Sequence, residues 1–190
     1  MLWSHLFKLR NHTVLIKLQI WKKLKIRSRG MESKVKGTSL HVTFLDYDYI
    51  NDERLREELQ FLQESFQIGN FYVFETRKKG RHAVCLDALT AKDQKQIVDF
   101  SNADPAFKKA PMINEFRCWV LRVDKKGKRP APKYLYTIVS PYEGTNPQSR
   151  GHCHYLFKFG LTVDLKNPIG EDGIYTEDYN TSEKNDETED

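Results

Sequence analysis

The sequence predicts an α+β domain with the element order β-α-β-β-α-β and additional C-terminal strands. Two observations predict this class. Segments in which apolar residues alternate with polar ones, as strands require, are interleaved with segments in which they recur every three or four positions, as helices require. The 190 residues, 39% hydrophobic and 30% charged, are enough for one domain with a buried core.

The first strand is predicted in SLHVTFLDYD, residues 39–48. Alternation places four of its side chains on one face: Val42, Phe44, Asp46 and Asp48. A helix is predicted next, over residues 51–66, because Asn51 can cap its N-terminus and acidic residues fill its first turn. Its apolar stripe consists of Leu55, Leu59, Leu62 and Phe66.

Two further strands are predicted at residues 70–76 and 81–87, joined by a KKG turn. A second helix is expected to follow, with Thr90 and Asp93 as a capping box and an apolar side that includes Ile97. The remaining predicted strands are RCWVLRV (117–123), KYLYTIVS (133–140) and HCHYLFKFG (152–160).

This order is that of a split βαβ sheet, also described as RNA-recognition-motif-like. In such a sheet the first strand lies between the third and the fourth and is antiparallel to both. The end of the first strand then lies beside the start of the third. We therefore expect Asp46 and Asp48 to lie next to His82.

Charge divides the chain into three segments. Residues 1–36 are expected to be a basic extension, since the first 30 residues hold eight Lys or Arg and no acid. An amphipathic helix, a transit-like peptide and an extension upstream of a true start at Met31 are all open interpretations. The domain is placed at 37–166, and 167–190 is expected to be an acidic, disordered tail.

Three widely spaced cysteines form no CxxC pair, so a reducing compartment, the cytoplasm, is the expected location. No apolar stretch approaches the roughly 20 residues that a membrane span requires.

Two short segments carry the predicted chemistry. Two carboxylates at i and i+2, Asp46 and Asp48, can hold a divalent cation together with substrate phosphates. TRKKGRH, residues 76–82, offers basic side chains, glycine amides and His82 to phosphate oxygens. Each pattern alone is common, but the predicted sheet brings the two segments together.

With these motifs, residues 38–125 resemble the archaeo-eukaryotic primase superfamily, which includes the primase-polymerases. VTFLDYD is similar to that family's first motif, an apolar run followed by Asp-x-Asp or Asp-x-Glu. TRKKGRH is similar to its second motif, with Thr76, Gly80 and His82 in corresponding places. Many members have Ser where this chain has Gly80, and the chain is short for the family.

The resemblance implies a metal-dependent nucleotidyltransferase that makes a short primer on a single-stranded DNA template. Asp46, Asp48 and a third acid would bind Mg²⁺ or Mn²⁺. Seven residues would contact the nucleoside triphosphate: Thr76, Arg77, Lys78, Lys79, Gly80, His82 and Arg122. A separate replicative helicase is a further expected partner.

Asp104 is the first choice for the third acid, because it lies between the second helix and the strand at 117–123. Glu115 and Asp124 are the other candidates. A basic loop is expected to follow the template backbone; it contains Lys125, Lys126, Lys128 and Arg129.

Two other functions stay open. His152 and His154, with Tyr175 and Tyr179, resemble the metal-binding histidines and tyrosine nucleophiles of rolling-circle nicking endonucleases. The two histidines could also join the cysteines in a zinc site, although the usual spacing is lacking. Alternatively, the sheet could bind single-stranded nucleic acid without catalysis, as RNA-recognition motifs do.

Overall fold

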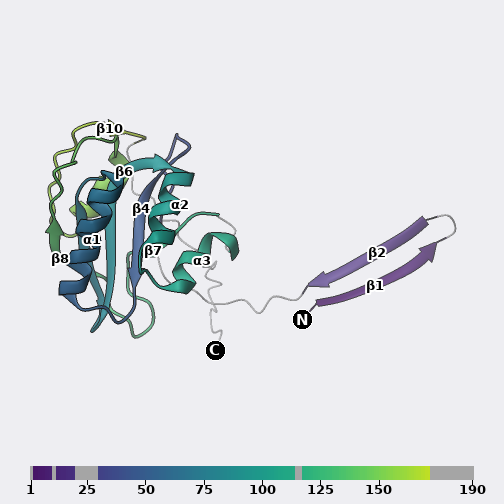
Figure 1. The fold of residues 1–190 in the computed structure, drawn as a ribbon. Coiled ribbons are helices and arrows are strands. Elements are labelled where there is room, and N and C mark those ends of the chain that lie inside the picture. Colours follow the sequence, from purple (N-terminus) through teal and green to yellow (C-terminus); the bar gives the residue numbers. More distant parts are fainter. Residues whose placement is uncertain (1, 10–11, 20–29, 114–116, 172–190) are drawn as a thin grey trace, which may run out of the picture.

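The computed structural model describes residues 2–9, 12–19, 30–113 and 117–171 (Figure 1). It is an α+β fold, as predicted. In the main sheet, β6 lies between β4 and β5, and β8 pairs with the other edge of β5; all of these pairs are antiparallel. The strands are β4 (Leu40–Tyr47), β5 (Phe71–Arg77), β6 (Gly80–Thr90) and β8 (Lys133–Ile138), with the short β9 (Gln148–Ser149) and β10 (Pro168–Ile169).

Two helices, α1 (Asp52–Phe66) and α2 (Ala91–Phe100), lie over the same face of this sheet (Figure 1). Both predicted caps are confirmed. The Asn51 side chain accepts a hydrogen bond from the Arg54 backbone N–H, and Thr90 caps α2 through the N–H of Asp93. The strand and helix order predicted for residues 39–100 is therefore correct.

The opposite face of the sheet is covered by α4 (Arg150–Phe157), which the sequence analysis wrongly predicted to be a strand. Phe74 of β5 packs against Tyr155 and Phe159, and Phe44 of β4 contacts the ring of His152. A short apolar run fits either period, and here the helical spacing prevails because Ser149 caps the helix.

The predicted fourth strand does not join the main sheet. Instead, β7 (Val120–Arg122) pairs antiparallel with β3 (Gly30–Glu32). The free edge of β4 is occupied by other backbone groups: the Val42 N–H donates to the Ser33 carbonyl, and the Asp104 N–H donates to the Asp46 carbonyl. Since these groups already satisfy that edge, a strand at 117–123 has few hydrogen-bonding positions left there.

One helix was not predicted. It is α3 (Pro105–Ile113), which begins directly after Asp104. The Asp104 carboxylate accepts hydrogen bonds from the N–H groups of Ala106 and Phe107, so it caps the helix, and Pro105 suits the first helical position. The Asp-Pro pair was the available sequence signal.

Residues 2–9 and 12–19 form strands and not a helix. Antiparallel strands β1 (Leu2–Leu9) and β2 (His12–Gln19) pair with each other, so a helical interpretation is wrong for these residues. Met31 and Val35 are each only 1% exposed and belong to the core, so the packed domain includes residues that the boundary at 37 left out.

At the C-terminal end, β10 pairs with β9, so residues 168 and 169 also pack with the domain. Residues 172–190 of the expected tail lie outside the described part. Within the residues that the structure describes, no helix is long and apolar enough to cross a membrane.

Candidate functional site

The predicted neighbourhood of the first acid and the histidine is confirmed. Asp46 of β4 lies directly opposite His82 of β6 in the strand register. The Asp46 Oδ1 atom is 3.5 Å from the His82 Nε2 atom. The antiparallel pairing of the two strands thus brings the first motif beside the last residue of the second.

The preferred third acid also lies here. The Asp104 N–H donates a 2.7 Å hydrogen bond to the Asp46 carbonyl, which fixes the start of α3 against the end of β4. Asp104 is close enough for its charge to act on the Asp46 carboxyl. One of its own carboxylate oxygens caps α3, so its capacity for a cation is shared with the helix.

The electrostatics of Asp46 reflect this crowding. Burial raises the pKa of Asp46 to about 6, and the charges of Asp48 and then Asp104 add to this effect. Arg77 and Arg122 oppose it. Three carboxylates that repel one another create a local negative potential that a divalent cation would relieve.

His82 is buried, with 5% of its surface exposed. Burial, assisted by the nearby charge of Arg122, lowers the pKa of His82 to about 3, so its imidazole is neutral. Its Nδ1 atom has no hydrogen-bond partner among the described residues. A neutral imidazole carries one N–H donor and one acceptor nitrogen, and the nitrogen that faces Asp46 is Nε2.

The basic turn contacts the acids directly. Arg77, at the end of β5, forms an ion pair with Asp48, and its guanidinium lies 5.1 Å from the centre of the Tyr49 ring. The turn also requires glycine at position 80. A Cβ atom at Gly80 would lie 2.6 Å from the Thr76 Oγ1 atom and 2.7 Å from the Arg77 Cγ atom. A side chain at position 80 would therefore displace Arg77.

Arg122 reaches the site from outside the main sheet. Its guanidinium donates to the carbonyls of Asp124 and Thr76, at 2.7 and 3.3 Å, and to that of Pro130. These bonds join β7 and the end of the 124–130 loop to the predicted phosphate-binding segment. In that loop a β-bridge links Lys126 to Arg129, and the basic side chains are exposed: Lys125, Lys126, Lys128 and Arg129.

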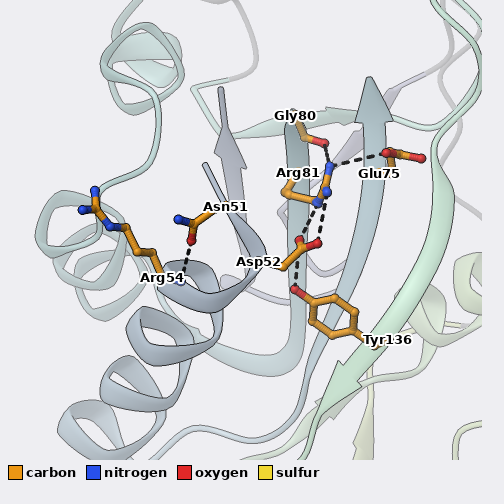
Figure 2. Close-up of polar contacts among 7 residues, drawn as sticks. All are labelled: Asn51, Asp52, Arg54, Glu75, Gly80, Arg81 and Tyr136. Carbon is orange, nitrogen blue, oxygen red and sulfur yellow. Dashed lines mark hydrogen bonds and ion pairs between the residues drawn. The ribbon is translucent and has the colours of Figure 1, made fainter. Parts of the chain in front are cut away.

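A polar network that the sequence did not indicate lies on the helix side of the sheet, as Figure 2 shows. Arg81 donates to both carboxylate oxygens of Asp52 at 2.9 and 3.3 Å, and its Nη1 atom lies 3.6 Å from a Glu75 oxygen. The Tyr136 hydroxyl donates to Asp52 at 3.4 Å. Alternation placed Arg81 and His82 on opposite faces, which was the available signal.

The carboxylates near Asp46 are candidate oxygen ligands for a cation. Among the described residues, no group of three or more His, Cys, Asp or Glu side chains is arranged to hold a metal ion. Mg²⁺ usually takes one or two protein carboxylates and completes its shell with water and phosphate oxygens. Asp46 and Asp48 fit that pattern, with Asp104 as a third, partly engaged carboxylate.

Other predicted candidates lie elsewhere or outside the described residues. Both ring nitrogens of His152 are hydrogen-bonded, to Ser149 and to the Glu32 carbonyl, so this histidine is engaged in the structure. Glu115 lies outside the described residues, as do both candidate tyrosine nucleophiles.

Searches of protein-family models, of curated proteins and of solved structures returned no match to this chain.

Proposed function

We propose that the chain is a metal-dependent nucleotidyltransferase of primase-polymerase type, acting on nucleoside triphosphates and a single-stranded DNA template. The observation that carries the proposal is the meeting of Asp46, His82 and Asp104 at one end of β4. They come from three segments that local folding alone does not bring together. The crowding of Asp46 by the charges of Asp48 and Asp104, together with its raised pKa, supports a site for a ligand.

In this proposal Asp46 and Asp48 bind Mg²⁺ or Mn²⁺, with Asp104 as the third acid. A bound metal would lower the pKa of the attacking 3′-hydroxyl and neutralise charge on the triphosphate. Arg77, Lys78 and Lys79 hold phosphate oxygens, and the ion pair between Arg77 and Asp48 keeps the phosphate-binding side chain beside the metal ligand.

Arg122 adds a positive charge on the same side of the sheet as Asp46 and His82. Its hydrogen bonds to backbone carbonyls orient it. We assign it a phosphate contact, and we assign the template backbone to the exposed basic loop that follows β7.

We also propose that the domain is a variant of the RNA-recognition-motif-like sheet. The order β4-α1-β5-β6-α2 and the antiparallel pairing of β6 with β4 and β5 support this interpretation. In this variant, residues 33–35 and Asp104 occupy the edge of β4 that a fourth strand would otherwise use.

Two features favour catalysis over the other functions considered. Phe74, which would serve a non-catalytic stacking platform, is fully buried under α4. His152, one of the two metal ligands of a nicking endonuclease, has both ring nitrogens occupied. We also propose a cytoplasmic location, because the three cysteines are widely spaced and form no CxxC pair in the sequence.

The test is synthesis on single-stranded DNA with Mn²⁺ and labelled nucleotides. We expect labelled products from the wild type and none from the Asp46→Asn/Asp48→Asn variant. Asp164→Asn is the matched control, because this carboxylate is exposed and pairs with Lys166 away from the site. Equal labelling by wild type and double variant, or no labelling by either, would refute the proposal.

A further inference from the structure

An open hollow of about 1110 Å³ adjoins the candidate site on its helix side. It lies between the segment that links β4 to α1, the first turns of α1 and the tip of the β5–β6 hairpin. Among its lining residues are Asp48, Tyr49, Phe61, Lys78 and Lys79. Asp48 and the two lysines belong to the proposed metal and phosphate contacts, so the hollow shares these three residues with the proposed site, whereas Asp46 and His82 do not line it.

Tyr49 is unusual in both backbone and side chain. Its φ angle is 64°, in the left-handed region that a bulky residue rarely occupies, and its side chain is 75% exposed. Such a conformation costs about 1–3 kcal/mol and often marks a functional position. Since the ring is largely exposed, burial of the ring does not offset this cost.

The ring of Tyr49 is nevertheless oriented. The Arg77 guanidinium lies 5.1 Å from its centre, within the range of a cation–π contact, and the same guanidinium pairs with Asp48. One residue therefore links the exposed aromatic ring to a proposed metal ligand. The ring is held at the rim of the hollow with most of its surface open to a ligand.

Two of the acids that line the hollow are engaged by residues other than its lysines. Asp52 is engaged by Arg81 (Figure 2), and Glu58 accepts hydrogen bonds from Tyr47 and Asn102. Within the part of the chain that the structure describes, no ion pair is recorded for Lys78 or Lys79. The ammonium groups of Lys78 and Lys79 can therefore bind an anionic ligand.

We propose that this hollow binds the nucleoside part of the incoming nucleoside triphosphate, with the base stacked on Tyr49 and the phosphates on Lys78 and Lys79. This inference rests on the proposed function and names the nucleotide subsite of the same centre. A volume of this order suits a small molecule, and a π-face accepts any base. A continuous nucleic-acid strand would need a groove along the surface. Lys78 and Lys79 are already assigned to the triphosphate, so we assign the hollow to a single nucleotide.

The experiment compares the binding of a nucleoside triphosphate with that of inorganic tripolyphosphate, both with Mg²⁺ and without template, by calorimetry. For Tyr49→Ala we expect about tenfold weaker nucleotide binding and unchanged tripolyphosphate binding, because only the base contact is lost. Tyr49→Phe keeps the ring and should bind like the wild type. Lys78→Ala/Lys79→Ala should weaken the binding of both ligands.

Phe157→Ala serves as the control, because Phe157 is also exposed but lies on α4. Equal nucleotide affinity of Tyr49→Ala and wild type overturns the inference, as does the absence of nucleotide binding by the wild type. If the Tyr49 variant alters nucleotide binding but no synthesis occurs, the subsite stands and the polymerase function fails. If synthesis occurs with unaltered affinity, the subsite fails and the function stands.

Discussion

The carboxyl of Asp46 is partly buried and lies near two other acids, and this environment has a measurable consequence for stability. Its pKa in the folded protein is about 6, raised from the ordinary value of 3.8 for an aspartate mainly by burial. The folded state therefore favours the protonated form, and the ionised form destabilises the fold as the pH rises from about 4 to above 6. Asparagine cannot ionise and escapes this effect.

We therefore predict that Asp46→Asn stabilises the protein above pH 6, by about 1–2 kcal/mol, and leaves it unchanged near pH 4. Thermal unfolding followed by circular dichroism from pH 4 to 8 tests this prediction. Asp164→Asn should show no such gain, because Lys166 lowers the pKa of Asp164. A variant that is less stable than wild type at pH 8 would contradict the assignment.

Tyr49 offers a second test at the scale of one residue. Glycine adopts a φ of 64° without the steric cost that an L side chain has there. Tyr49→Gly should therefore unfold at a temperature about 2–4 °C higher than wild type, while it loses affinity for nucleotide. A lower unfolding temperature would show that the ring stabilises the fold by more than the left-handed backbone of Tyr49 costs.

The sequence allowed the acids and the histidine to be placed together, because strand register follows from period-two alternation and a short turn. It did not reveal which charged groups pair. Arg77 contacts Asp48, and Arg81 contacts Asp52, through side chains whose rotamers depend on the packed neighbours. These ion pairs join residues that are distant in the sequence, so no local sequence pattern predicts them.

At the scale of elements, Arg81 joins β6 to the first residue of α1. Its side chain is only 10% exposed, whereas that of Asp52 is 48% exposed. The link fixes the start of the helix against the strand that carries His82. It therefore holds the first turn of α1, which lines the hollow, beside the start of β6.

A double-mutant cycle with Arg81→Gln and Asp52→Asn should give a coupling energy of about 1 kcal/mol. Arg81→Gln alone should lower the free energy of unfolding more than Asp52→Asn alone. The side chain at position 81 is buried and would lose its partner there, whereas Asp52 faces water. Urea unfolding of the four proteins measures both quantities. Additive effects would show that the two side chains do not support each other.

The elements that the sequence analysis misplaced share a cause. The segment 117–123 has the alternating pattern of a strand, but the pattern does not specify which strand it pairs with. It pairs with β3 rather than with β4. In α4, His152, Tyr155 and Leu156 are buried at helical spacing within a run that also alternates. Local period therefore decided the long elements correctly and failed where the run was short.

At the scale of the molecule, residues 30–36 connect distant parts of the fold. β3 pairs with β7, the Ser33 carbonyl receives the Val42 N–H, and Met31 and Val35 enter the core. This segment holds β7, and hence Arg122, near β4.

A chain that starts at residue 37 should be less stable than one that starts at residue 30, by about 4 kcal/mol or more, because two buried side chains and their backbone bonds are lost. Thermal unfolding of the two chains makes the comparison. Equal stability would mean that β3 and β7 are not needed for the central sheet.

We propose that Asp46 and Asp48 bind a divalent cation together with a nucleoside triphosphate. Electron paramagnetic resonance of Mn²⁺ measures this directly, since bound and free ions give different signals. We predict that the wild type retains Mn²⁺ weakly alone and at least about tenfold more tightly with a nucleoside triphosphate, because phosphate oxygens complete the shell. Asp46→Asn/Asp48→Asn should show no such gain, and an equal gain in wild type and variant would contradict the account.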